Sequence, residues 1–319
     1  MCLIGLAIEQ HPRFPLVIAA NRDEFQDRPS AALDCWRAPS SGELLLGGRD
    51  LHAGGTWMGL AGNGRLAMLT NVRDLARRHA SAPSRGTIVP SWLATTLPVD
   101  AFWRDTAAHA HNPFNLLAGD MAQGRWWWAD DRTVAPQALG PGLYGLSNAL
   151  LDTPWPKVAR LKQTFAEALT HAASTTALET ALFAALADRT PVPDSDLPDT
   201  GVGLDRERWL APAFIRTPDA RYGTRCSTLL ITERRDQALR TRMVERQFAA
   251  DGSAARQRSA SWTHGPGAGG QLPVVVDEPL NTARASWPGA RCRPPGTARR
   301  PAQNRFADKT PQHWPAHAA

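Results

Sequence analysis

The chain begins with two apolar stretches that decide its fold, Cys2-Leu-Ile-Gly-Leu-Ala-Ile-Glu9 and Phe14-Pro-Leu-Val-Ile-Ala-Ala-Asn21. The residues between them, Gln10-His-Pro-Arg13, include a proline that favours a turn, so the pattern predicts two strands joined as a β-hairpin. Neighbouring residues of each stretch are apolar, which is typical of strands that are covered on both faces. The opening of the sequence therefore predicts a sheet that lies between two other layers.

The register of this hairpin decides which residue lies opposite Cys2. A connecting loop of four residues places Cys2 opposite Asn21, and a loop of three residues places it opposite Arg22. A slip of one residue turns every side chain to the other face, and the sequence leaves both registers open. In either register the run Asn21-Arg-Asp-Glu24 ends beside Cys2, which brings a thiol, a guanidinium and two carboxylates to one end of the sheet.

Cys2 directly follows the initiator methionine, and its small side chain is the context in which Met1 is normally removed. Removal leaves a thiol and a free α-amine on one carbon, and an α-amine with a pKa of about 8 can act as the base for its own side chain. Arg22 would favour the thiolate, and Asp23 could hold the amine. The alternative is a buried strand cysteine beside a structural cluster of charges.

Further short motifs accompany the hairpin. In chain order they are Gly-Gly-Arg-Asp at 47–50, Gly-Gly-Thr-Trp-Met-Gly at 54–59, 64–73, Ser-Arg-Gly at 84–86, 112–120, Tyr-Gly-Leu-Ser-Asn at 144–148, Pro-Trp-Pro-Lys at 154–157 and 222–228. Together with Cys2 and the run at 20–25, they resemble the NRDE family, also called the Transport and Golgi organisation protein 2 family. The resemblance implies the α+β fold of N-terminal-nucleophile hydrolases, a four-layer αββα sandwich, in one domain spanning residues 1–251.

A second hairpin is predicted around Asn63-Gly64, a pair that favours a type I′ turn between strands at 55–62 and 65–71. In this register Asn71 lies opposite Thr56 at the far strand end. The resemblance implies that the Asn71 side chain donates a hydrogen bond to an oxyanion. The alternative is a residue that only caps the end of the strand.

The resemblance implies the remaining site residues as well. Asn148 is a second candidate donor to the oxyanion, or else a cap in the loop before a helix. A strand is predicted at 222–232 with Arg221 and Arg225 at its head, and one of these two, Arg225 in the predicted site, could anchor an acidic group; the alternative is a solvated arginine at a strand end. The predicted site residues are Cys2, Arg22, Asp23, Asn71 and Asn148 for catalysis, and Asn21, Glu24 and Arg225 for substrate binding.

Helices are predicted near residues 84–96, 98–110, 154–170 and 174–188. No histidine, including those of His109-x-His111, has the cysteine or carboxylate spacing that suits zinc, so no metal site is predicted. The sequence contains no Walker loop, no Gly-x-Ser-x-Gly elbow and no Cys-x-x-Cys pair. Phosphate-loop, serine-hydrolase and dithiol chemistry are therefore not expected.

The net charge of +6 is distributed unevenly over the 319 residues. Residues 252–319 hold nine basic and three acidic residues, which accounts for the whole net charge, and residues 1–251 are neutral on formal count. Because the folded part then carries no obvious basic patch, no nucleic acid is expected as a partner. Since 16 of the last 68 residues are proline or glycine, we predict a disordered tail at 252–319, whose deletion leaves the melting temperature nearly unchanged.

The opening apolar run has no basic residues before it, and no run of about 18 apolar residues occurs. A secretory signal and a membrane span are therefore not expected, and the predicted location is the cytoplasm.

Two functions remain open from the sequence. The first is a cysteine amidohydrolase that uses Cys2 to cleave a small-molecule amide without a cofactor. The second, which rests on the resemblance alone, is a non-catalytic protein that binds or carries haem or a lipid such as acyl-CoA. Substrate identity and oligomeric state are not readable from the sequence.

Overall fold

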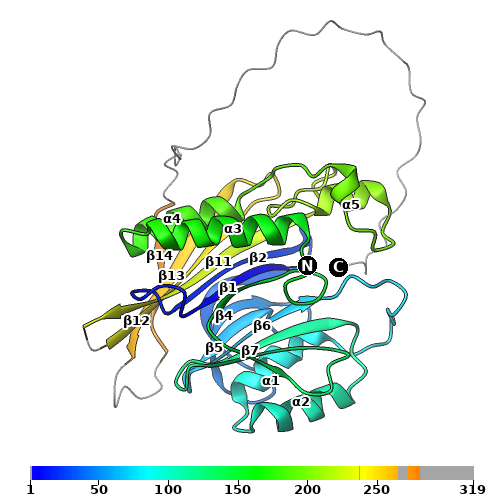
Figure 1. Ribbon diagram of the computed structural model, residues 1–319. Helices are drawn as coiled ribbons and strands as arrows, with labels where there is room; N and C mark the ends of the chain where they lie inside the picture. Colours follow the sequence, from blue (N-terminus) through cyan, green and yellow to red (C-terminus); the bar gives the residue numbers. More distant parts are fainter. Residues whose placement is uncertain (1, 237, 265–271, 281–319) are drawn as a thin grey trace, which may run out of the picture.

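The computed structural model describes residues 2–236, 238–264 and 272–280, and within them the chain forms two antiparallel sheets of seven strands each and five α-helices. Figure 1 shows the two sheets face to face, with helices on the outer side of each. These sheets and helices confirm the α+β class that was predicted from the sequence.

The first sheet contains the amino-terminal hairpin. In spatial order its strands are β10 (Gly142–Leu146), β1 (Cys2–Ile8), β2 (Leu16–Phe25), β11 (Tyr222–Arg235), β12 (Ala238–Phe248), β13 (Ala254–His264) and β14 (Val275–Glu278). Cys2 pairs with Arg22, so the register with the three-residue loop is the one adopted. Because β10 and β11 flank the hairpin, β1 and β2 are interior strands of the sheet, with both faces buried.

The second sheet runs through strands that follow one another in the chain. They are β3 (Ser30–Arg37), β4 (Leu44–Asp50), β5 (Met58–Ala61), β6 (Arg65–Asn71), β7 (Phe114–Asp120), β8 (Arg125–Asp130) and β9 (Gln137–Leu139). Each strand pairs with the next one along the chain, as expected for short connections.

The turn between β5 and β6 differs from the predicted type I′ turn. That turn needs a positive φ at both central residues, but only Gly64 has one, at +85°, while Asn63 does not. Met58 pairs with Met68, so the loop has three residues instead of two and the register is shifted by one. The prediction that Asn71 lies opposite Thr56 is therefore wrong.

Four of the helices pack on the outer faces of the sheets. Helices α3 (Pro156–His171) and α4 (Thr175–Leu186) lie on the first sheet, and α1 (Ile88–Ala94) and α2 (Val99–Ala108) lie on the second (Figure 1). These four correspond to the predicted helices. The fifth, α5 (Leu204–Leu210), was not predicted: it is as short as α1, and four charged residues separate its apolar ones, so it shows no apolar helical period.

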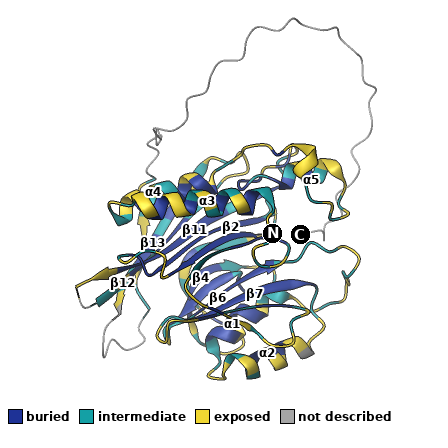
Figure 2. Ribbon diagram, in the orientation of Figure 1, coloured by how far each residue is buried: buried dark blue, intermediate teal, exposed yellow. Residues whose placement is uncertain are grey.

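Alternate residues of β1 and β2 face opposite layers. Leu3 and Val17 pack against the helices, whereas Ile4 and Ile18 pack against the second sheet, and Figure 2 shows these strands buried over most of their length. The same alternation continues to the end of β2. It turns Arg22 and Asp23 to opposite faces of the first sheet.

The predicted disordered tail is wrong for two stretches within it. β13 (Ala254–His264) pairs with β12 along its whole length, and β14 (Val275–Glu278) pairs with β13. β13 lacks the apolar pattern of a core strand because much of its buried surface consists of small or polar side chains, such as Ser259 and Gln257. The rest of the predicted tail, 265–271 and 281–319, lies outside the described residues.

Candidate active site at Cys2

Cys2 opens β1 and is 7 % exposed. It lies opposite Arg22 of β2, which in turn lies opposite Cys226 of β11, so Arg22 has a cysteine on either side in the sheet. Cys2 lines a cavity of about 200 Å³, called here the Cys2 cavity. The cavity is lined by Cys2, Arg22, Asp23, Glu24, Arg28, Asp50, Ala53, Thr56, Trp57, Leu69, Asn71, Ala82, Pro83, Ser84, Arg85, Gly86 and Asn112.

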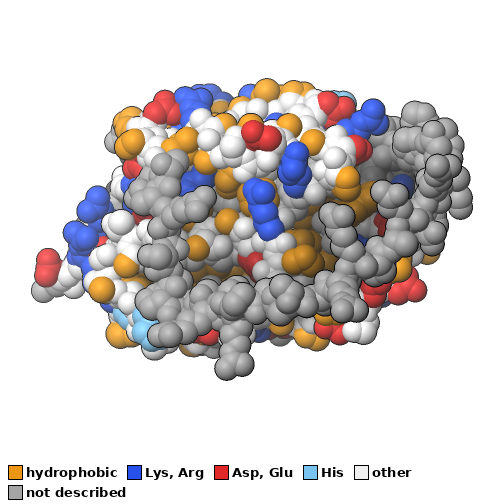
Figure 3. All heavy atoms as spheres, turned by 90° about the horizontal axis from the view of Figure 1, so that it is seen from above, with side chains coloured by type: hydrophobic (Ala, Val, Ile, Leu, Met, Phe, Trp, Pro, Cys, Tyr) orange, Lys and Arg blue, Asp and Glu red, His pale blue; other side chains and the backbone are white. Residues whose placement is uncertain are grey.

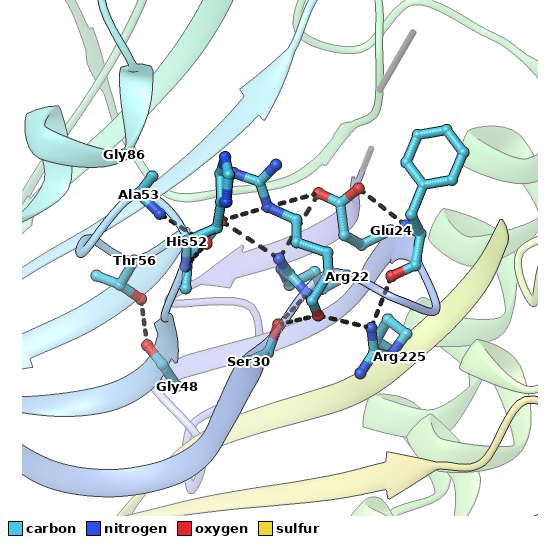
Figure 4. Close-up of polar contacts among 12 residues, drawn as sticks. Arg22, Glu24, Ser30, Gly48, His52, Ala53, Thr56, Gly86 and Arg225 are labelled. Atoms are coloured by element: carbon cyan, nitrogen blue, oxygen red, sulfur yellow. Dashed lines mark hydrogen bonds and ion pairs between the residues drawn. The ribbon is translucent and has the colours of Figure 1, made fainter. Parts of the chain in front are cut away.

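Arg22 is held in place from several sides. Its guanidinium donates a hydrogen bond to Ser30 Oγ at 3.1 Å and lies 3.6 Å from a carboxylate oxygen of both Glu24 and Asp50. It also stacks on the ring of Trp57, 4.4 Å from the centroid. Figure 4 shows Arg22 between Ser30 and Glu24. With only 5 % of its side chain exposed, Arg22 is a fixed positive charge beside Cys2.

The glycine motifs explain how Trp57 reaches Arg22. A Cβ atom at Gly48 would lie 2.3 Å from the Trp57 ring, so only glycine fits at that position. Thr56 ties the same segments together, because its hydroxyl donates to the Gly48 carbonyl at 2.6 Å (Figure 4). The neighbouring motifs at 47–50 and 54–59 therefore build one wall of the cavity together.

The environment of Cys2 does not favour the thiolate. Burial raises the pKa of the Cys2 thiol, and the negative charges of Asp23 and Glu24 raise it further, while Arg22 only partly opposes them. Arg22 thus favours the thiolate, as predicted, but it does not offset burial, and the pKa of Cys2 lies above its usual value. A reaction at Cys2 needs a base that takes the thiol proton as the sulfur attacks.

Asp23 lies on the helix-facing side of the same strand end and is 1 % exposed. Its Oδ1 accepts a hydrogen bond from Thr224 Oγ1 at 2.7 Å, and its backbone carbonyl accepts one from the Tyr222 hydroxyl at 2.9 Å. Burial raises the pKa of Asp23, and the ammonium of Lys157 opposes that shift. Asp23 is thus a buried carboxyl group at the end of β2 that lies beside Cys2, on the helix-facing side of the sheet.

Lys157 and the pair of Arg73 with Glu207 were missed by sequence reasoning. Lys157, at the start of α3, is 3 % exposed and donates to the Leu210 carbonyl at 3.0 Å. Burial, followed by repulsion from Arg73, lowers the pKa of Lys157 to about 8. Arg73 is bonded to the Glu207 carboxylate at 2.7 Å. The motif at 154–157 was the only signal in the sequence, because burial of a lysine is decided by the packing of distant elements.

Asn71 and Asn148 come together, but in different roles. Asn71 lines the Cys2 cavity, and among the described residues none forms a hydrogen bond with its side-chain amide. Asn148 does not line this cavity; its amide donates to the Asn71 backbone carbonyl at 2.8 Å, and it lines an adjoining pocket of about 40 Å³. Asn71 therefore has a free donor at the cavity, and Asn148 holds the end of its strand.

Two of the three residues predicted for substrate binding lie elsewhere. Asn21 faces the helices, where its amide donates to the carbonyls of Leu186 and Ala213, both at 2.8 Å. Arg225 donates to the carbonyls of Phe25, Gln26 and Arg28 and so fixes the connection after β2 (Figure 4). We correct both predictions, because these side chains are used in the fold. Glu24 does line the Cys2 cavity.

Glu245 is a further buried carboxyl group near this end of the sheet. It is 2 % exposed, accepts a hydrogen bond from the Leu33 backbone at 2.7 Å and lies near Cys226. Burial raises the pKa of Glu245 to about 7. Sequence patterns do not single out Glu245, since it lies in a strand of mixed polar and apolar residues.

The described residues contain neither a candidate metal-binding cluster nor a membrane-spanning helix. In residues 2–236, 238–264 and 272–280, no group of three His, Cys, Asp or Glu side chains is arranged to hold a metal ion. Within the same ranges, no helix is long and apolar enough to cross a membrane.

These features define the class: an α+β protein of two stacked sheets, with a candidate site at the amino-terminal end of a buried strand. The chain matches Transport and Golgi organisation 2 over residues 1–250. It is 33 % identical over 255 residues to the Transport and Golgi organization protein 2 homolog of Bos taurus, and 32 % identical over 253 residues to that of Homo sapiens. Each match covers 73 % of this chain and 89 % of the relative. The chain belongs to the Transport and Golgi organisation 2 family, and the resemblance found in the sequence is confirmed.

Among solved structures, the chain is similar to the Caenorhabditis elegans N-acylethanolamine-hydrolyzing acid amidase ortholog. The TM-score is 0.38 at 12 % sequence identity, and the match covers 72 % of this chain and 92 % of that one.

Proposed function

We propose that the protein is a cysteine amidohydrolase of the N-terminal-nucleophile type, with the αββα layering of that class, and that it cleaves a small amide. One observation carries the proposal: the thiol of the second residue of the chain faces a cavity that also holds a fixed arginine and an unused amide donor. A cysteine with a purely structural role in a strand requires neither a cavity nor a neighbouring arginine and amide donor.

The proposed reaction starts with removal of Met1, which frees the α-amine of Cys2. As Sγ bonds to the substrate carbonyl carbon, the thiol proton moves to this amine, which is why a raised thiol pKa is compatible with catalysis. The Asn71 amide donates to the oxyanion, and Asp23 stabilises the protonated amine. Collapse breaks the C–N bond, and the leaving nitrogen takes the proton from the amine.

Water then attacks the thioester, which releases the carboxylic acid and restores the thiol. Arg22 acts as a fixed positive charge beside the sulfur during both steps, and Lys157 opposes the rise that burial causes in the pKa of Asp23. Asn148 is a positioning residue in this scheme, because it acts through the backbone of Asn71.

The cavity volume favours this function over the binding of haem or acyl-CoA. Sites for drug-sized ligands commonly measure about 300–1,000 Å³, and the Cys2 cavity measures about 200 Å³. A small amide fits such a space better than a large cofactor or a lipid carrier.

Intact-mass measurement and activity of three proteins test the proposal. The purified protein should lack Met1 and should hydrolyse members of a panel of small N-acyl compounds. Cys2→Ala should lower kcat/KM at least about 1,000-fold, because no other group can form the thioester. Cys35→Ser is the matched control, since Cys35 is a half-buried strand cysteine outside the cavity. Retained Met1 in active protein, or activity that survives Cys2→Ala, contradicts the proposal.

A further inference from the structure

Arg85 joins the Cys2 cavity to the adjoining pocket. Arg85 lines both hollows, as do Asn71 and Asn112, so the two spaces meet at these residues. Arg78 lines the adjoining pocket from the same loop, between β6 and α1. Two guanidiniums therefore lie where a substrate held at Cys2 would extend beyond the reacting carbonyl.

Neither of these arginines has a carboxylate partner among the described residues. The Arg85 guanidinium donates to the Pro113 carbonyl at 3.0 Å, and the Arg78 side chain forms no hydrogen bond or ion pair within 2–236, 238–264 and 272–280. Burial, followed by repulsion from Arg78, lowers the pKa of Arg85 to about 10, so Arg85 stays charged at neutral pH. Two positive charges close to each other without a counter-ion are unfavourable unless an anion joins them.

The carboxylates around the two hollows already have other partners. Asp74 is bonded to Arg77 at 2.6 Å and to Arg132 at 3.2 Å. Glu24 and Asp50 lie between Arg22 and Arg28, and Glu207 is bonded to Arg73. These carboxylates are therefore already paired, and the guanidiniums of Arg78 and Arg85 are available to bind an anionic ligand.

We propose that Arg78 and Arg85 bind a carboxylate of the substrate, so that the amide cleaved at Cys2 belongs to the class of small N-acyl amino acids. A guanidinium matches a carboxylate with two parallel hydrogen bonds, and the adjoining pocket has room for a group of that size. The apolar lining near Cys2, formed by Trp57, Leu69 and Pro83, suits a short acyl chain. This inference rests on the proposed function and adds the substrate class to it.

The test compares N-butanoylglycine with N-butanoylglycinamide, which has the same shape without the negative charge. The wild-type protein should prefer the acid by about tenfold or more in kcat/KM, and Arg78→Gln should bring the ratio close to one. Arg78→Gln is the primary variant because the Arg78 side chain holds no other residue of the described part in place. Arg104→Gln, which removes an exposed arginine on α2, should keep the preference. Equal rates for acid and amide in the wild type, or an unchanged ratio in Arg78→Gln, overturn the inference.

A binding measurement separates this inference from the proposed function. If neither compound is hydrolysed, the amidohydrolase proposal fails, and calorimetry with the Cys2→Ala protein then decides the anion site alone. Saturable binding of N-butanoylglycine that is at least tenfold weaker in Arg78→Gln supports the site. Absence of binding, or equal binding of the acid and its amide, overturns it.

Discussion

Arginines line both the Cys2 cavity with its adjoining pocket and a larger hollow, and these two regions differ in how the charges are paired. The larger one, called here the outer groove, measures about 1,070 Å³ and lies between α4 and the outer face of β11 to β14. Its lining includes Glu179, Phe183, Glu233, Arg235, Arg240, Arg242, Arg246, Gln257 and Glu278. Figure 3, a view onto the face of the molecule that carries α3 and α4, shows charged side chains of both signs.

The two half-buried arginines that line the outer groove, Arg242 and Arg246, are paired within the protein. Arg242 is bonded to Glu179 at 2.7 Å and to Glu278 at 2.8 Å, and Arg246 donates to Gln257 and stacks on Phe183. At the Cys2 cavity and its adjoining pocket, by contrast, Arg85 and Arg78 have no carboxylate partner among the described residues. The comparison teaches that volume alone does not identify a ligand site. The half-buried arginines of the outer groove are paired within the fold, whereas Arg78 and Arg85 are the arginines that we propose bind a ligand.

The largest effect is expected when the outer groove loses one wall. A chain cut after Asp251 lacks β13 and β14, so β12 loses the pairing along its whole length and the groove loses Gln257 and Glu278. We expect a loss of at least about 4 kcal/mol in the free energy of unfolding, measured by urea denaturation. The chain cut after Leu280 keeps both strands and is the control. Equal stability of the two shortened chains would restore the domain boundary predicted from the sequence.

The next effect concerns Lys157 behind the Cys2 cavity. Its pKa is lowered from 10.5 to about 8 in the folded protein, so between these values the unfolded chain binds more protons and stability rises with pH. The difference in unfolding free energy between wild type and Lys157→Met should therefore change by about 3 kcal/mol from pH 7 to pH 10.5. Lys162→Met, on the same helix with a side chain 32 % exposed, is the control and should show a small change. A flat difference for Lys157 would show that the lysine is solvated.

A carboxyl group without a cation partner should behave oppositely to a paired one. The pKa of Glu245 is raised from 4.5 to about 7, so stability falls as pH rises through this range, and the full cost is present at pH 8. Glu245→Gln should stabilise the protein at pH 8 by about 2 kcal/mol, after allowance for the unpaired amide. Glu278→Gln, which breaks a pair in the outer groove, should destabilise it, because the hydrogen bond from Arg242 lowers the pKa of Glu278 despite partial burial. If both substitutions changed the free energy of unfolding in the same direction, the proposed difference between unpaired and paired carboxyl groups would be wrong.

The smallest effect is expected for Arg242→Gln in the outer groove. Arg242 is 24 % exposed and loses two carboxylate partners, so we expect a loss of about 1 kcal/mol at low salt and less at 1 M salt. Hydrolysis at Cys2 should change less than about twofold, because the groove lies on the outer face of the sheet. A large loss of activity would mean that the two hollows act together.

Much of the fold was readable from the sequence where local pattern dominates. The apolar stretches of β1 and β2, the helices α1 to α4 and the grouping of Cys2 with Arg22 and Glu24 were all predicted. The turn at Gly64 was not, because a three-residue loop and a two-residue loop use the same Asn-Gly pair and differ only in backbone angles. Strand β13 was missed because it is stabilised by pairing with β12 more than by apolar side chains of its own.

The sequence by itself determined which chemical groups the protein has near its amino terminus: a cysteine at position 2 and the run Asn21-Arg-Asp-Glu24. Tertiary structure decided what each group does. The strand register and alternation turned Arg22 to the cavity and Asn21 to the helices, and burial raised the pKa of Cys2. Burial also set the charges of Lys157 and Glu245, because the cost of removing a charge from water depends on packing between segments far apart in the chain.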